Sequence, residues 1–155
     1  MTVICSVDIG IKNPAYSVFR CIGSKVSLIA IEKSDWSRNW EYNVTKDLTK
    51  YNPNIIVLEK QGFRSPNSKI IYFIKGFFYN TNTLVVVRNP TFQGGSYSNR
   101  KKQSVITFTE KISRYSDYKD EILSSFTKLD DVADSFNLGI SYIESKIKNV
   151  KKSIQ

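Results

Sequence analysis

Two acidic residues of this sequence each stand directly after a short apolar run of the kind that forms a buried strand. Asp8 follows the first such run and Glu59 follows the fourth. If the two strands are neighbours running the same way, both carboxylates lie at one edge of the sheet, where the active sites of such sheets are found. Asp131 and Asp134, spaced i and i+3, share one face of a later helix. These four acids are the candidate catalytic and metal-binding residues.

Four acids gathered at one place need positive charge between them, because like charges repel. Hard carboxylate oxygens favour Mg²⁺ or Mn²⁺ over softer metals, and a pair of such ions activates water and stabilises the leaving oxygen of a phosphodiester. Each acid also has a plainer interpretation. Asp8 suits a turn, Glu59 suits a solvated strand end, and Asp131 suits a helix start, where it complements the helix dipole.

The absence of histidine narrows the chemistry of the chain. It excludes Ser-His-Asp and Cys-His nucleophiles, and two cysteines alone cannot form a Cys/His zinc site. Hydrolysis must therefore rely on carboxylates, metal ions, lysine or tyrosine. Lys101 and Lys102 follow a Gly-Gly loop at the start of a predicted helix. Either lysine could offset charge in a phosphoryl-transfer transition state, or simply contact a phosphate.

The charge of the chain points to a polyanionic partner. Lys and Arg number 23 against 14 Asp and Glu, a formal net charge of +9. The span from Lys60 to Thr109 contains eight basic residues and no acid, which favours a nucleic-acid surface over a merely soluble basic face. The candidate DNA-binding residues are Lys60, Gln61, Phe63, Arg64, Lys69, Arg88, Tyr97, Arg100 and Lys101. For Phe63 and Tyr97, stacking on bases and ordinary packing are equally good interpretations.

Hydrophobic periodicity predicts an α/β fold. Three β-rich runs separated by Asn-Pro and Gly-Ser turns predict an antiparallel meander, after which helices alternate with two further strands. The predicted strands cover residues 2–8, 16–21, 26–31, 55–58 and 84–87. The predicted helices cover residues 37–51, 65–78 with Ser65 as N-cap, a stretch capped by Ser98 or Asn99, and 128–150, while 116–125 is irregular. This order predicts a five-stranded mixed sheet, the meander plus parallel strands, flanked by helices.

The last predicted helix raises a difficulty for the acid cluster. By helical geometry Asp131, Asp134 and Leu138 lie opposite its long apolar stripe, which includes Phe136 and Ile140. Periodicity alone makes the acidic face a solvated one. A functional role therefore requires this helix to be packed on both sides, with its acidic face turned to the sheet edge.

Length and composition predict one intracellular domain covering residues 1–155. No apolar run approaches the roughly 20 residues that span a bilayer, and the N-terminus lacks the basic region of a signal peptide. We therefore expect no membrane partner. Cys5 and Cys21 are expected to be free thiols in a reducing compartment, with a disulfide between neighbouring strands as the alternative.

Four segments, in order along the whole chain, resemble motifs of the RNase H-like Holliday-junction resolvases. Residues 7–16 are similar to their first-strand motif, and residues 56–65 resemble the Glu-x-Gln-x-x-Arg-Ser segment of the mitochondrial resolvases. Residues 102–105 look like their Lys-x-x-Val helix start, and residues 130–135 resemble the closing Asp-x-x-Asp motif of the bacterial RuvC group. Chain length and motifs together are most similar to the poxvirus resolvases.

This resemblance implies an RNase H-like nuclease that cuts branched DNA, chiefly four-way junctions, by paired symmetric nicks. It implies that Asp8, Glu59, Asp131 and Asp134 bind two Mg²⁺ ions per active site, with Mn²⁺ as a substitute. It implies that Lys102 is the catalytic lysine, with Lys101 as the competing assignment. It also implies a homodimer, which supplies two symmetric active sites, and a location in the host cytoplasm. The broadly apolar helix at 70–78 is the candidate dimer interface.

Two rival functions remain at this point. The first is a noncatalytic basic module that binds structured nucleic acid, for which the basic span would suffice. The second is a sugar-kinase-like ATPase, because Asp-x-Gly also begins its phosphate loop. That fold needs two such domains and a much longer chain, so it fits poorly.

Overall fold

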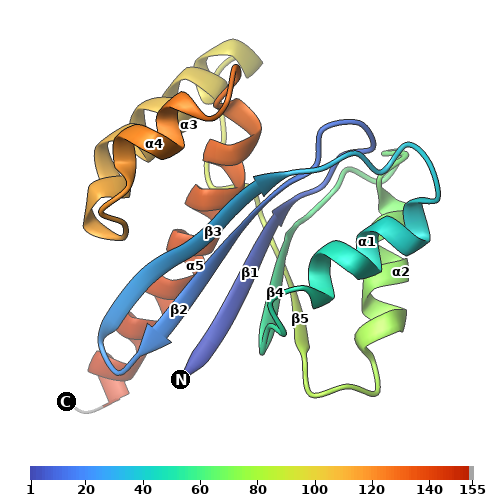
Figure 1. Ribbon diagram of the computed structural model, residues 1–155, viewed down its shortest axis with the longest axis horizontal. Helices are drawn as coiled ribbons and strands as arrows, with labels where there is room; N and C mark the ends of the chain where they lie inside the picture. Colours follow the sequence, from blue (N-terminus) through green and yellow to red (C-terminus); the bar gives the residue numbers. More distant parts are fainter. Residues whose placement is uncertain (154–155) are drawn as a thin grey trace.

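The computed structural model describes residues 1–153, which are built on a five-stranded sheet (Figure 1). The strands are β1 (Thr2–Asp8), β2 (Ala15–Ile22), β3 (Lys25–Lys33), β4 (Ile55–Glu59) and β5 (Leu84–Arg88). Their spatial order is β3-β2-β1-β4-β5. β1, β2 and β3 form an antiparallel meander, whereas β1, β4 and β5 are parallel. The predicted mixed sheet is confirmed.

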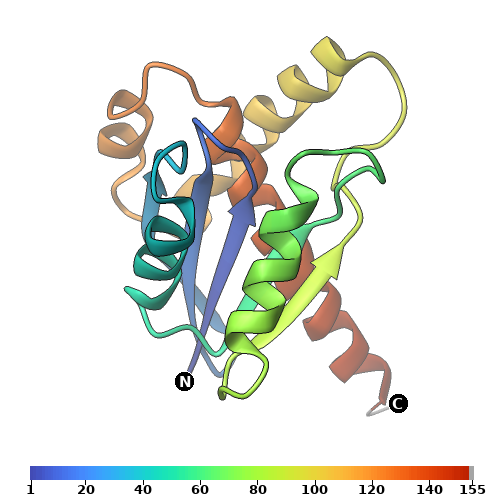
Figure 2. The ribbon, with the colours of Figure 1, turned by 90° about the vertical axis from the view of Figure 1, so that its right-hand side faces the viewer.

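Helices cover both faces of this sheet (Figures 1 and 2). They are α1 (Trp40–Thr49), α2 (Ser68–Phe78), α3 (Tyr97–Lys111), α4 (Lys119–Ser124) and α5 (Asp130–Ser153), with a 3-10 turn η1 (Ile112–Arg114) after α3. α1 and α2 share one hydrophobic core with the sheet, and α5 and α3 share a second core on its other face. Within residues 1–153, no helix is long and apolar enough to cross a membrane.

Three local predictions about the helices are wrong. Ser65 does not cap α2 but lies in the preceding turn, where its Oγ accepts a hydrogen bond from the Asn67 N–H at 3.2 Å. The N-cap of α3 is Ser96, earlier than either predicted residue, because its Oγ accepts from the Asn99 N–H. Residues 116–125, predicted to be irregular, contain α4. Cap residues crowd these loops, and sequence alone does not choose among them.

α5 is packed on two sides, between the sheet and α3 (Figure 1). Phe136 and Ile140 of its apolar stripe are buried, and so is Leu138 on the opposite side of the helix. The acidic face of α5 is therefore not a solvated surface, and the packing that the acid cluster required is present.

A buried hydroxyl network sets how closely α5 approaches the sheet. Ser6 Oγ on β1 donates to the main-chain carbonyl of Ser135 at 2.6 Å, and Ser17 Oγ on β2 lies 2.8 Å from Ser135 Oγ. All three serines are fully buried. Because an unpaired buried hydroxyl is costly, these contacts fix the distance of α5 from the sheet and the rotation of α5 about its own axis.

The two cysteines are free thiols, as predicted. Cys5 belongs to the core under α1 and α2, whereas Cys21 packs against the core on the α5 face. The two side chains therefore lie on opposite faces of the sheet, which rules out the disulfide. Burial raises the pKa of the Cys5 thiol to about 12, so it is an inert core residue.

Glu32 on β3 anchors α1 to the sheet. Its carboxylate accepts hydrogen bonds from Tyr16 Oη at 2.8 Å, from Lys50 Nζ at 2.8 and 3.0 Å, and from Tyr51 Oη. Partial burial works against the charge, but the hydrogen bonds from Lys50 and the two tyrosines outweigh it and lower the pKa of Glu32 below its ordinary value of 4.5. The ionised form is therefore the one that the fold stabilises.

Glu32→Gln is expected to lower the free energy of unfolding at neutral pH by about 1 to 2 kcal/mol, because the variant loses charge-assisted hydrogen bonds. A lowered folded-state pKa contributes stability above the ordinary value of 4.5, and this is lost as the pH falls through the folded-state value. Urea unfolding should therefore show a deficit at neutral pH that shrinks as the pH falls below the ordinary value of 4.5. An equal deficit at both pH values would contradict this. Exposed Glu41→Gln is the matched control.

Candidate active site

Asp8 and Glu59 lie next to each other at one edge of the sheet. β1 and β4 pair in parallel with Val7 opposite Leu58. Asp8 and Glu59 directly follow these two residues, so they lie side by side at the ends of neighbouring strands. Val7 and Leu58 are both fully buried, which fixes the register. The two carboxylates share the strand-end edge, as the apolar runs before them predicted.

α5 and α3 bring two further charged groups to this edge. Lys101 Nζ forms an ion pair with Asp134 Oδ2, and the Ser104 hydroxyl hydrogen-bonds to the other carboxylate oxygen. Asn137, one turn after Asp134, donates its amide N–H groups to the carbonyl and hydroxyl of Ser104 at 2.9 and 3.1 Å. The Asp134 side chain is therefore held in one orientation by two residues of α3.

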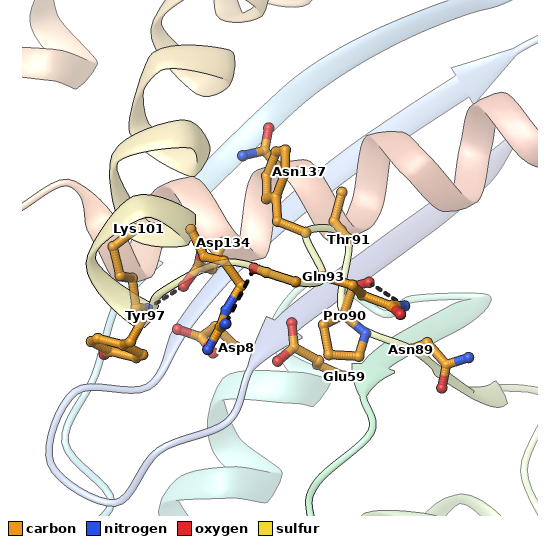
Figure 3. A pocket seen from close by; sticks show the side chains of 13 residues that line it. Asp8, Glu59, Asn89, Pro90, Thr91, Gln93, Tyr97, Lys101, Asp134 and Asn137 are labelled. Carbon is orange, nitrogen blue, oxygen red and sulfur yellow. Dashed lines mark hydrogen bonds and ion pairs between the residues drawn. The ribbon is translucent and has the colours of Figure 1, made fainter.

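Apart from Ser104, these charged and polar side chains line an open cleft of about 500 Å³ (Figure 3). Asp8, Glu59 and Asp134 gather at one part of it, and Lys101 reaches in from α3 beside them. The opposite wall is the loop 89–94 between β5 and α3. The carboxylates thus lie in a cleft bounded by α3 on one side and by this loop on the other.

The loop that forms this wall is shaped by two glycines and one arginine. Gly94 and Gly95 have φ values of +78° and +65°, which glycine adopts without strain. The Arg100 guanidinium donates to both of their carbonyls, at 3.3 and 2.8 Å. Arg100, a predicted DNA contact, is therefore occupied in holding the wall.

The electrostatics of the cleft show how strongly it concentrates negative charge. Burial, followed by the charge of Asp134, raises the pKa of Asp8 well above its ordinary value, against the opposing effect of Lys101. Burial and the charge of Asp134 also raise the pKa of Glu59. Burial opposes the charge of Lys101, but its ion pair with Asp134 raises the pKa of Lys101 above its usual range. One ammonium group thus faces several carboxylates.

Asp131 lies apart from the other three acids. Lys33 Nζ, at the end of β3, is 3.1 Å from Asp131 Oδ2, and Asp131 is not among the residues that line the cleft. The charge of Asp131 still raises the pKa of Asp8, although less than the charges of Asp134 and Glu59 do. The structure therefore brings three of the four predicted acids together in the cleft and leaves the fourth, Asp131, paired with Lys33 outside its lining.

The donor set suits a hard divalent cation. The carboxylates of Asp8, Glu59 and Asp134 repel one another, and a bound cation would relieve that repulsion. Asn137 lines the same cleft, and its Oδ1 is buried without a hydrogen-bond partner in the described part of the chain. As the side chains stand, no three Asp, Glu or Cys residues within 1–153 are arranged to hold an ion. Metal binding therefore requires the carboxylates to turn toward one another.

The two candidate lysines occupy different environments. Lys101 lines the cleft and pairs with Asp134, whereas Lys102 is exposed and is not among the cleft-lining residues. Successive helical residues point about 100° apart, so one of two adjacent lysines necessarily turns away. The geometry favours Lys101, the competing assignment, over Lys102.

Two more of the predicted DNA-binding residues have partners inside the protein. Arg88 donates through Nη1 to Ser145 Oγ at 3.2 Å and lies over the Tyr142 ring. Gln61 donates through Nε2 to the Glu59 carbonyl at 3.2 Å, which shapes the loop after β4. Their side chains thus support the fold around the cleft.

The other predicted DNA-binding residues form an exposed rim at the strand-end edge. Phe63 is fully exposed at 101%, and Tyr97 is 68% exposed with Lys101 Nζ 5.6 Å from its ring centroid. Lys60 and Arg64 are exposed on the same loop as Phe63. The remaining one, Lys69, is exposed at the start of α2, with its Nζ 5.1 Å from the Trp40 ring.

The sequence did not reveal Lys33, Ser104, Asn137 or the loop wall at 89–94. Ser104 and Asn137 carry a usable signal, since each is a polar residue at a helical position where periodicity demands burial. Lys33 becomes recognisable as a neighbour of the acids once the strand register is known. Ala15 of β2 pairs with Asp8 on one side and with Lys33 on the other.

The meander-first sheet order, with acids at the ends of β1 and β4 and on the final helix, defines the RNase H-like class of fold. Thermus thermophilus RuvC matches it with a TM-score of 0.59 at 14% identity, over 88% of this chain and 90% of that chain. A family model described as Poxvirus A22 protein matches residues 2–148. The chain belongs to this poxvirus family.

Relatives with much higher identity come from poxviruses. A protein of fowlpox virus (strain NVSL), named Holliday junction resolvase, is 67% identical over 97% of this chain and 98% of its own length. A resolvase of vaccinia virus (strain Western Reserve) is 43% identical over 93% of this chain and 76% of its own. The crystal structure of the fowlpox resolvase with its Holliday junction substrate has a TM-score of 0.89 and 68% identity, over 92% of this chain and 97% of that chain.

Proposed function

We propose that this protein is a structure-specific DNA endonuclease that resolves Holliday junctions and related branched DNA. The observation that carries the proposal is the meeting of Asp8, Glu59 and Asp134 with Lys101 in one cleft at a basic edge. The fowlpox relatives add support, one by its name and one by its structure with junction DNA. A net charge of +9 suits a polyanionic substrate.

Divalent metal ions complete this site in our proposal. Asp8, Glu59, Asp131 and Asp134 would hold two Mg²⁺ ions, with Mn²⁺ as a substitute. When bound, such ions supply an activated water and neutralise the leaving oxygen. The support is the hard oxygen donor set and the mutual repulsion of its carboxylates. Asp131, now paired with Lys33, would have to turn toward the other three acids to join them.

The protein's own groups position the reacting phosphodiester. Water adds to phosphorus and the P–O3′ bond breaks, which leaves 5′-phosphate and 3′-hydroxyl ends. Ser104, itself bound by Asn137, holds Asp134, and the wall at 89–94 limits the approach of the backbone. Lys101, in place of Lys102, offsets the charge that develops on the phosphoryl oxygens.

The exposed rim guides the DNA arms toward the cleft. Lys60, Arg64 and Lys69 contact phosphates, which position the duplex without reading its sequence. Phe63 and Tyr97 stack on bases at the crossover, where strands part and π-faces become accessible. The 101% exposure of Phe63 supports this reading over ordinary packing, because the ring is not covered by any of residues 1–153.

Two symmetric nicks require two active sites, so we propose a homodimer. α2 is the proposed interface. Its inner residues fill the core, yet its outer face still carries Tyr72 at 73% exposure and Phe77 at 46%, and Tyr79 follows at 83%. Exposed aromatic groups of this kind mark interaction surfaces.

We also propose that residues 1–155 form one nuclease domain that acts in the host cytoplasm. The two free thiols of Cys5 and Cys21 suit a reducing compartment, and the relatives come from poxviruses.

A synthetic four-way junction tests the proposed activity. The protein is incubated with junctions labelled on each strand, with Mg²⁺ or with EDTA, and the nicks are mapped. Paired symmetric nicks that need Mg²⁺ and leave ligatable ends are expected. Binding without cleavage in Mg²⁺ or Mn²⁺ would instead establish the noncatalytic basic module. Asymmetric or metal-independent products would overturn the two-metal dimer.

Lys101→Met is expected to lower the junction cleavage rate by about tenfold to a hundredfold, the loss of one charge-assisted contact in the transition state. Lys102→Met, the matched control, removes the same charge from an exposed neighbouring position and should change the rate by less than about threefold. Single-turnover rates at saturating protein separate this effect from weaker binding. The reverse order of the two variants would return the catalytic assignment to Lys102.

Tyr72→Glu is expected to weaken the dimer about thirtyfold, the effect of losing a central aromatic anchor. Sedimentation velocity over a concentration series should show dimers for the unaltered protein and mainly monomers for the variant. Tyr118→Glu makes the same change at a similarly exposed tyrosine (67% against 73%) outside α2, and should leave the dimer intact. Equal dimer affinity for all three proteins would remove α2 as the interface.

A further inference from the structure

Lys33 reaches the acid cluster from the far side of the meander. It ends β3 opposite Ala15 of β2, and Ala15 lies opposite Asp8 of β1. Directly paired residues point to the same face of a sheet, so Lys33 and Asp8 share the face covered by α5. Two strand spacings separate their backbones by about 10 Å. An ammonium group is thus built into the edge of the acidic site.

Lys33 pairs with Asp131, the one predicted metal-binding acid that does not line the cleft. Its Nζ lies 3.1 Å from Asp131 Oδ2, and the two side chains are 25% and 22% exposed, so the pair is largely shielded from water. Asp134, three residues further along α5, is held by Lys101 instead. Each acid of the α5 pair therefore has its own lysine, and the two lysines come from different elements.

The two ion pairs act on the site in opposite ways. Lys101 lies inside the cleft, where it and Asp134 are both close enough to Asp8 to affect its pKa. Lys33 lies outside it and holds Asp131 on the β3 side, away from the lining. A cation that draws Asp131 toward the other carboxylates competes with Lys33, because the ammonium and the metal ion are attracted to the same carboxylate charge.

We propose that Lys33 is a positioning residue that competes with divalent cations for Asp131 and thereby sets the metal affinity of the site. Without a cation, Lys33 offsets the repulsion that Asp131 meets from the other acids. When a cation binds, Asp131 exchanges Lys33 for it. This inference rests on the proposed use of metal ions, and it assigns a role to a residue outside the acid–lysine set of the nuclease site.

The proposal predicts a gain of metal affinity on removing a positive charge. Calorimetric titration of the full chain with Mn²⁺ alone, without DNA, should give a dissociation constant about fivefold lower for Lys33→Gln than for the unaltered protein. Lys33→Arg retains the competing charge and should restore the original value. Lys50→Gln breaks a comparable lysine–carboxylate pair with Glu32, away from the cleft, and should leave Mn²⁺ affinity unchanged.

A second measurement follows the ion pair directly in the unaltered protein. In ¹⁵N-lysine NMR of the unaltered protein, the Lys33 ammonium protons should exchange slowly without metal and markedly faster after Mg²⁺ is added, as the pair with Asp131 opens. Lys33→Arg assigns the signal. Exchange that Mg²⁺ does not change would overturn the proposal, and so would equal or weaker Mn²⁺ binding by Lys33→Gln.

The outcomes separate this inference from the proposed function. If the unaltered protein binds Mn²⁺ and nicks junctions but Lys33→Gln binds Mn²⁺ no more tightly, the role of Lys33 fails and the nuclease stands. If the unaltered protein neither binds Mn²⁺ nor nicks junctions, both fail together, because Lys33 then has no cation to compete with.

Discussion

Asp134→Asn is expected to reduce junction cleavage by about a thousandfold while the variant still folds and binds junction DNA. Asp134 lies at the centre of the candidate site, since its charge raises the pKa of both Asp8 and Glu59 and its carboxylate pairs with Lys101. The amide has the same shape and can still accept the Ser104 hydrogen bond, so the fold around it persists. What disappears is a charged oxygen that a cation would bind.

Cleavage and binding must be measured separately to test this expectation. Removing one negative charge beside a basic rim should leave junction affinity equal or higher, because phosphate contacts dominate it. Asp120→Asn, at an exposed position of α4, makes the same chemical change away from the cleft and should cut at the normal rate. If Asp134→Asn also cut at the normal rate, the catalytic interpretation of the acids would be wrong.

The strand-end half of the site could be predicted because it depends on local signals. A continuous apolar run implies a strand buried on both faces, and its first polar residue marks where the strand leaves the core. Asp8 and Glu59 both occupy that position, and parallel pairing of β1 with β4 then brings them together without further information. The alternation of strands and helices constrained the sheet order in the same way.

The orientation of the helical half of the site could not be predicted, because it depends on packing between distant segments. Periodicity gave two faces of α5 but not their orientation, which is decided by burial of Leu138 and by the Ser6–Ser135 contact. Similarly, Lys101 and Lys102 are equivalent in sequence, and only the rotation of α3 on α5 distinguishes them. Such contacts join residues about 30 or more than 100 positions apart.

Gly139 is the residue that allows α5 to lie this close to the sheet. A Cβ at this position would stand 2.4 Å from Phe19 Cε2 and 2.5 Å from Ser6 Oγ. Neither atom can easily retreat, since Phe19 and Ser6 are fully buried and Ser6 holds the Ser135 carbonyl. A side chain at 139 must therefore lift α5, and Asp134 with it, away from β1 and from Asp8.

Gly139→Ala is accordingly expected to lower the free energy of unfolding by about 2 to 3 kcal/mol, although alanine is by itself the better helix former by about 1 kcal/mol. The cleavage rate of the folded variant should also fall about a hundredfold, because a displacement of about 1 Å is enough to disable a catalytic group. Gly76→Ala on α2, where an added Cβ meets nothing within 4 Å, is the matched control. It should raise stability by about 0.5 to 1 kcal/mol when both variants are compared in the same oligomeric state. Urea unfolding reports the two opposite signs, and a stabilising effect of Gly139→Ala would show that α5 reaches its position without this close contact.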